Sequence, residues 1–192
     1  KVFLVSHRNQ YIIDHKGKIE MSPNPGAWEK WEISLSSHYS QEEVMRQIFI
    51  KNNKNRYEKR KKHSVQLKNK FNNKYIHIKS HKNNHIMSTP DGKIGLSPNK
   101  DIWEIWRVQY INNDEFYLIG WHKHYLSDSN GSIVADKNYS DESKWKLEIG
   151  DNGRVFIISH RYEYIIDNNN KIGMSINAGA WEQWEILISN HP

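Results

Sequence analysis

Short apolar segments alternate with polar segments along most of the chain, and the alternation has the same form in four places. In the first place the apolar segments cover residues 2–6, 11–13, 19–21 and 28–34, and the residues between them are rich in Gly, Pro, Asn and charge. Apolar residues at period two, bounded by turn residues, predict β-strands. Each of the four places therefore predicts a unit of four short strands.

The four places are copies of one sequence. Residues 2–33 and 155–186 agree at roughly 21 of about 32 aligned positions, and diverged copies occupy 74–108 and 115–147. A repeat of this length cannot bury its own apolar face, so the copies must pack against one another. The repetition predicts an all-β assembly.

One tryptophan stands at the same place in every copy, and the last three are about 39 residues apart. An aromatic residue at a fixed register of every repeat indicates a layer of the hydrophobic core rather than a cage for a ligand. The predicted core residues are Trp31, Trp106, Trp145 and Trp184.

The motifs of the copies are more specific than their period. A strand ends in Ser-His at residues 6–7, and Tyr followed by two hydrophobic residues begins the next strand at residue 11. Gly-Lys-Ile and then Gly-x-Trp-Glu-x-aromatic-Glu-Ile complete the copy. In these motifs the chain resembles the fascin-like β-trefoil family, which includes the fascins and hisactophilins. The resemblance covers the four copies, about 135 residues, and implies a six-stranded barrel capped by three hairpins.

A trefoil needs three units, and the chain has four. Residues 74–192 are expected to form one complete β-trefoil from the repeats 74–110, 111–150 and 151–190. Residues 1–34 are then a repeat left over from an upstream trefoil or shared with a second chain in a swapped homodimer. In the alternative arrangement the first three repeats close the trefoil and the fourth is swapped.

Residues 35–73 separate the first two copies and are predicted to be a basic, partly helical insert or linker. They hold about ten Lys and Arg against three acidic residues. Ser40 and Glu43 have the spacing of a capping box, which predicts a helix beginning there. Asn52 and Asn53 weaken the helical pattern farther on.

The basic run of the insert is the candidate partner-binding segment. It is either solvated or binds an acidic surface, such as F-actin, another acidic protein or an anionic lipid leaflet. Nucleic acid ranks below these, because Tyr57 is the one aromatic residue within the run and the others are expected in the core. The candidate residues are Lys54, Arg56, Lys59, Arg60, Lys61 and Lys62.

Catalytic and metal chemistry have no support in the sequence. The chain has no Cys, which excludes disulfides and thiolate ligands. His7, His81 and His160 stand at the same turn of different repeats, so they should lie far apart and serve as turn residues. There is no Gly-rich phosphate loop and no His-Glu-x-x-His motif. The sequence predicts no enzyme activity, no cofactor and no metal.

The leading expectation is a cytoplasmic, non-enzymatic interaction module. The family resemblance implies that it binds or bundles actin. The alternative is a scaffold, or a lectin-like or anionic-lipid-binding trefoil, with no cytoskeletal role. The Gln-x-Trp signature of ricin-type trefoils is absent, because Gln183 directly precedes Trp184.

Overall fold

The computed structural model describes residues 2–3, 11–15, 18–22, 30–31 and 40–190, and the chain forms two compact units, Lys1–Met45 and Arg46–Pro192. In the first unit β2 and β3 form an antiparallel hairpin, and β1 pairs with β4. These strands overlap the four that the sequence pattern predicted. Their bounds are β1 Val2–Phe3, β2 Tyr11–His15, β3 Lys18–Ser22 and β4 Lys30–Trp31.

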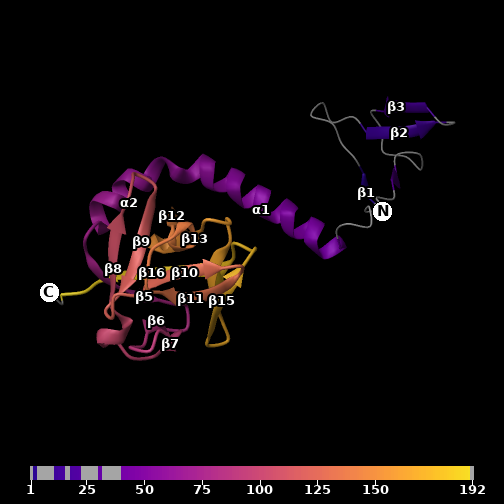
Figure 1. The fold of residues 1–192 in the computed structure, drawn as a ribbon. Helices are drawn as coiled ribbons and strands as arrows, with labels where there is room; N and C mark the ends of the chain where they lie inside the picture. Colours follow the sequence, from indigo (N-terminus) through magenta and orange to yellow (C-terminus); the bar gives the residue numbers. More distant parts are fainter. Residues whose placement is uncertain (1, 4–10, 16–17, 23–29, 32–39, 191–192) are drawn as a thin grey trace. The chain divides into compact units, whose positions relative to one another are not determined.

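The second unit contains helix α1 from Arg46 onward, helix α2 and twelve strands (Figure 1). The insert consists of α1 Gln41–Arg60, the 3₁₀ turn η1 Lys61–His63 and α2 Ser64–Phe71. The strands are β5 Tyr75–Lys79, β6 His85–Ser88, β7 Ile94–Ser97, β8 Trp106–Tyr110, β9 Glu115–Gly120, β10 Tyr125–Ser129, β11 Ser132–Asp136, β12 Trp145–Ile149, β13 Val155–Ser159, β14 Tyr164–Asn168, β15 Lys171–Ser175 and β16 Gln183–Ile188.

Six of these strands close into an antiparallel barrel. The pairing runs from β5 to β8, β9, β12, β13 and β16, and β16 pairs again with β5. The other six strands form the hairpins β6–β7, β10–β11 and β14–β15, and β7, β11 and β15 contact one another. A closed barrel has no free strand edge. A six-stranded barrel with three converging hairpins is β-trefoil-like, and this part of the chain is all-β as predicted.

Three tryptophans hold the hairpins to the barrel in the same way. Trp106, Trp145 and Trp184 are fully buried. Their indole N–H groups donate to the carbonyls of Ile86, Leu126 and Ile165 at 2.8, 2.8 and 2.9 Å. A buried indole N–H needs a hydrogen-bond acceptor. In each case the acceptor is a backbone carbonyl on the hairpin of the same sequence repeat. Trp31 lies in β4, and its side chain is outside the described residues, as is His7.

The turns after β5, β9 and β13, the first strands of the three repeats, have the same backbone conformation. Asn83, Lys123 and Tyr162 have φ of 62°, 65° and 61°. The residue three positions before each left-handed residue donates a backbone hydrogen bond across the turn, so the three turns share one hydrogen-bond pattern. The backbone N–H groups of Ser80, Gly120 and Ser159 donate to the carbonyls of Asn84, His124 and Glu163. The shared turn conformation shows which residues of the three repeats occupy equivalent positions.

The insert packs against the barrel from Arg46 onward. The hydroxyl of Ser40 accepts from the N–H of Glu43 at 3.1 Å, so the helix begins where the capping pattern predicted. The expected weakening at Asn52 and Asn53 does not occur. Asn53 is buried, and its amide donates to two carbonyls of the barrel, those of Tyr162 and Ile176, at 3.1 and 2.8 Å.

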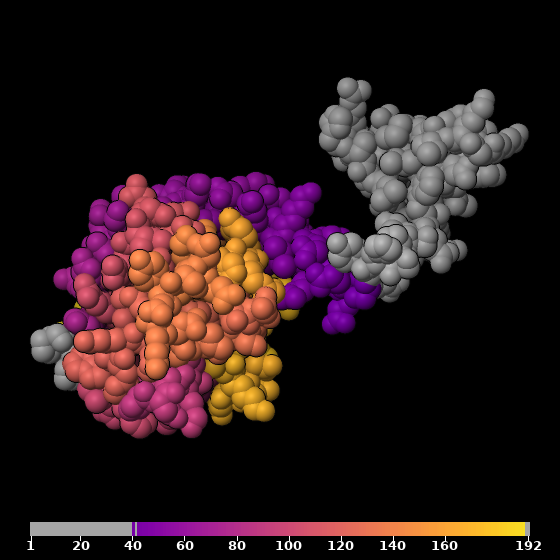
Figure 2. Space-filling view, in the orientation of Figure 1, coloured from indigo at the N-terminus to yellow at the C-terminus, as the bar shows by residue number. Residues whose placement is uncertain are grey.

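The second helix of the insert completes the core of the barrel. Leu67 and Phe71 of α2 are buried in the same cluster as the barrel tryptophans, and α2 contacts β12. Figure 2 shows that much of the insert, in purple, lies against one side of the barrel. The insert is thus a packed element of the second unit.

Candidate functional site

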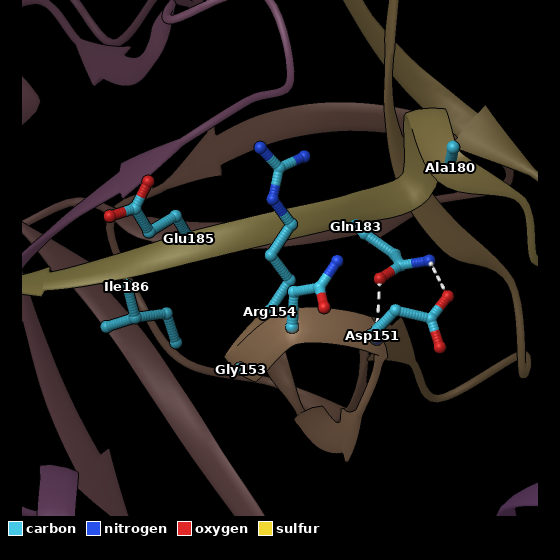
Figure 3. Close-up of a pocket in the computed structure, with 8 residues that line it drawn as sticks. Asp151, Gly153, Arg154, Ala180, Gln183, Glu185 and Ile186 are labelled. Atoms are coloured by element: carbon cyan, nitrogen blue, oxygen red, sulfur yellow. Dashed lines mark hydrogen bonds between the residues drawn. The ribbon is translucent and has the colours of Figure 1, made fainter.

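A polar cleft lies between the β12–β13 turn and strand β16 (Figure 3). Its volume is about 650 Å³, and it opens to solvent. The turn contributes two charged side chains and the strand contributes an amide and a carboxylate. The lining residues are Asp151, Asn152, Gly153, Arg154, Ala180, Gln183, Glu185 and Ile186.

The turn that forms one wall is compact because of its backbone. The N–H of Gly150 donates to the carbonyl of Arg154 at 2.8 Å. Asn152 and Gly153 have φ of 54° and 76°, which Asn and Gly adopt at lower cost than other residues. A side chain at Gly153 would meet nothing within 4 Å, so this part of the wall faces open space.

Gln183 fixes the floor of the cleft. Its side-chain oxygen accepts from the N–H of Asp151 at 2.8 Å, and its amide nitrogen donates to the Asp151 carboxylate at 3.0 Å. Gln183 is buried, whereas Asp151 is exposed. A Cβ at Gly150 would lie 2.7 Å from the Gln183 oxygen, so glycine at 150 leaves room for the pair. The Asp151 carboxylate is held in one orientation with part of its acceptor capacity facing solvent.

Arg154 and Glu185 supply the charges on the other side of the cleft. The Arg154 guanidinium extends from the turn past β16 (Figure 3), and among the described residues it makes no ion pair. Glu185 instead pairs with Lys79 at 2.7 Å. A guanidinium presents five N–H donors in a fixed plane. The cleft therefore offers donors and acceptors side by side.

The corresponding crevice of the preceding repeat lies between the β8–β9 turn and strand β12, and side chains of the protein fill it. There Glu115 and Lys146, at the positions of Arg154 and Glu185, form an ion pair at 2.7 Å across the strands. Burial raises the pKa of Glu115, but hydrogen bonds from Lys146 and Asn112 outweigh it and hold the pKa below its ordinary value. The insert also reaches this turn, because Lys68 donates to the side chain of Asn113 at 3.0 Å.

The crevice before β5 is filled as well. Arg107, which follows Trp106 as Glu185 follows Trp184, donates to the side chain of Asn73 at 3.3 Å. The side-chain oxygen of Asn72 accepts from the N–H of Tyr110 at 3.0 Å. The chain thus occupies two of three corresponding crevices with its own side chains and leaves the one at Arg154 open.

The candidate basic run does not act as a single surface. Arg56 and Arg60 both pair with the buried carboxylate of Glu148, at 2.8 and 3.0 Å. Lys54 lies 5.6 Å from the centre of the Tyr162 ring.

All four lysines of the run, Lys54 included, are exposed. Lys61 pairs with Glu58 at 2.6 Å. Lys59 and Lys62 line a separate hollow at the end of α1. The described structure therefore divides the run between internal ion pairs and solvent.

The histidines that the structure describes do not form a shared site. His81 stacks on Trp181, with ring centres 5.8 Å apart and planes inclined by 6°, and neither of its nitrogens has a hydrogen-bond partner among the residues that the structure describes. Within the described part of the chain no three His, Asp or Glu side chains come together as a metal site. In the same part, no helix has the length and apolar character that a bilayer span requires.

The sequence did not single out the residues of the cleft. In the sequence, Gln183 was relevant only because it directly precedes Trp184 and so does not complete a Gln-x-Trp signature. No sequence motif includes Asp151 or Arg154. The available signal was a difference between repeats. The residue directly before the conserved-register tryptophan is Gln183 in the last repeat, but Ile105 and Lys144 in the two before it. The pairing of β13 with β16 then brings residues 151 and 183 together.

Comparison with known proteins gives one line of evidence on the fold. No protein-family model matches the chain, and no curated protein matches it. Among solved structures it is similar to "SeviL bound to asialo-GM1 saccharide", with a TM-score of 0.54 and 16% identity over 59% of this chain and 96% of that one. The likeness supports a β-trefoil-like fold for the barrel unit, and it does not show membership of the fascin-like family.

Proposed function

We propose that the chain is a non-enzymatic binding module in which repeats 74–110, 111–150 and 151–190 close one β-trefoil and the cleft at Asp151, Arg154 and Gln183 binds a saccharide. The open cleft carries the proposal, since it is the crevice that the chain leaves unfilled. The likeness to a structure that contains a saccharide supports the choice of ligand class.

The chemistry of the cleft suits a sugar. A sugar ring presents neighbouring hydroxyl groups that each donate and accept, and planar carboxylate, amide and guanidinium groups match such pairs with two hydrogen bonds at a time. The Gln183–Asp151 hydrogen bonds fix the acceptor before binding, which lowers the entropic cost of binding. An open cleft buries little of a ligand, so a single site should bind weakly.

A glycan array tests this proposal. The intact protein should bind a subset of neutral saccharides, and Gln183→Ala and Arg154→Ala should each weaken that binding about tenfold or more. Lys144→Ala changes the position corresponding to Gln183 in the filled crevice and should leave binding within about twofold. Binding that survives both cleft variants would place the saccharide elsewhere.

Actin binding is a second expectation, and it rests on the sequence resemblance alone. Co-sedimentation of the intact protein with F-actin at low salt measures it directly. Pelleting with the filaments would support the resemblance, and its absence would leave the saccharide proposal standing by itself.

A further inference from the structure

A second hollow lies where the insert changes direction. Helix α1 ends at Arg60, whose φ and ψ of −106° and −11° depart from the helical values, and η1 follows at once. The change of direction gathers Lys59, Arg60, Lys62 and His63 around a hollow of about 310 Å³. The exposed side chain of Ile149, from the end of β12, forms its apolar wall. We call these five residues the basic hollow.

Among the described residues, the positive charges around the basic hollow outnumber the carboxylates that pair with them. Glu148 carries one negative charge and accepts from both Arg56 and Arg60. That pairing holds the Arg60 guanidinium against the barrel. Two guanidiniums share one carboxylate, so Arg56, Arg60 and Glu148 together keep one positive charge. Lys61, whose ammonium group pairs with Glu58, is not among the residues that line the hollow.

Two lysines remain available for a ligand. Lys59 and Lys62 are exposed, and among the described residues neither makes an ion pair. The ring of His63 is held by its Nδ1, which lies 3.3 Å from the side-chain oxygen of Gln66. Cations that converge on a hollow raise the local concentration of anions and bind them with charge-assisted hydrogen bonds.

We propose that the basic hollow binds an oxyanion, namely a sulfate or phosphate ester group, through Lys59, Lys62 and Arg60. Of the basic run, these residues alone line the hollow, whereas Arg56 belongs to the internal pair with Glu148 and Lys54 lies over Tyr162. Ile149 contacts the apolar part of the molecule that carries the group. This site is separate from the saccharide cleft and does not depend on the proposed function.

The same chemistry occurs on sulfated saccharides and on phosphorylated lipid headgroups. Binding is measured with two probes, a heparin-derived hexasaccharide in titration calorimetry and phosphatidylcholine vesicles containing phosphatidylinositol 4,5-bisphosphate in flotation. The probe that binds identifies the source of the oxyanion. Vesicles of phosphatidylcholine alone should not bind.

Two double variants decide whether the hollow is the site. Lys59→Gln with Lys62→Gln should weaken binding of the active probe about tenfold or more. Lys51→Gln with Lys54→Gln removes the same amount of charge from the insert at positions that do not line the hollow, and it should change binding by about twofold or less.

Two results would overturn the proposal. An equal loss in both double variants would mean that net charge alone attracts the probe. Binding of neither probe by the intact protein would mean that the hollow is solvated. Binding of neutral saccharides by the Lys59→Gln, Lys62→Gln variant should be unchanged, which separates this test from that of the cleft.

Discussion

The phenolic hydroxyl of Tyr57 donates a hydrogen bond to the carboxylate of Asp114 and thereby joins helix α1 to the turn between β8 and β9. The Tyr57 ring is fully buried beside Phe156, Ile158 and Tyr164. A tyrosine within a dense basic run is thus a core residue. The insert and the barrel should unfold as one unit from Arg46 onward.

Tyr57→Phe tests this coupling. The variant keeps the ring but leaves the Asp114 carboxylate without its donor, and it should lower the free energy of unfolding by about 1–3 kcal/mol. Urea denaturation followed by tryptophan fluorescence measures the loss. Tyr139→Phe is the matched control, because Tyr139 is 65% exposed. Equal stability of the two variants would mean that the insert is not held by this contact.

Buried tyrosines should make the protein sensitive to alkali. Burial raises the pKa of Tyr57 and Tyr110 well above the ordinary value and raises that of Tyr164 to about 12. The folded state therefore favours the neutral phenols. Their contribution to stability is complete below the unfolded pKa of about 10 and is lost as pH rises through the folded values.

The measurement is the urea midpoint as a function of pH, together with phenolate absorbance. We expect the midpoint to fall steadily above about pH 10 and the buried tyrosines to ionise only as the protein unfolds. A midpoint that stays constant from about pH 9 to about pH 12 would contradict the burial of these three side chains.

Glu148→Gln should be strongly destabilising. The carboxylate is fully buried and pairs with Arg56 and Arg60, so the variant leaves two guanidiniums without their counter-charge. Breaking a buried pair costs about 3–5 kcal/mol, and the partial exposure of both arginines reduces this to about 2–3 kcal/mol. Calorimetric or urea unfolding measures it.

Glu58→Gln is the control for that variant. Glu58 and its partner Lys61 are 45% and 47% exposed, and such surface pairs contribute about 0.5 kcal/mol or less. A similar loss in the two variants would show that Glu148 has no special place in holding the insert.

The pair His77 and His85 should give a mild sensitivity to acid. Their rings are buried, with centres 5.9 Å apart, and burial is the main cause that lowers the pKa of each below 6.5. Lys100 lowers both pKa values further, and Glu104 opposes this. The unfolded state then takes up protons first, so stability is complete above about pH 6.5 and falls as pH drops below it.

The double variant His77→Gln, His85→Gln should flatten the urea midpoint between about pH 7 and pH 5 relative to the parent. His63→Gln changes a half-buried histidine elsewhere and should leave the parent's slope in place. If the double variant keeps the parent's full slope, other groups cause the acid sensitivity.

The sequence predicts features that local pattern determines. Period-two alternation and turn residues locate the strands, the repeat locates the core tryptophans, and Ser40 locates the start of α1. These signals lie within a few residues of the structure that they specify. The predicted all-β class therefore agrees with the β-trefoil-like barrel.

Contacts between distant residues could not be predicted in this way. Asn53 extends the helix because carbonyls of Tyr162 and Ile176 accept from its amide. Arg56 and Arg60 form ion pairs with the barrel because a buried glutamate on β12 faces them. The cleft likewise depends on strand pairing, which places Gln183 beside Asp151, 32 residues earlier in the chain.

The most direct test of saccharide binding is a ¹H–¹⁵N NMR titration of the intact protein with a neutral saccharide selected on the glycan array. Binding at the cleft should shift the backbone amides of Asp151 and Gly153 and the side-chain amide of Gln183. The corresponding amides of the filled crevice, at Asn112 and Asp114, should stay in place. Shifts at the filled crevice instead of the cleft, or no shift with any saccharide of the panel, would contradict the proposed function.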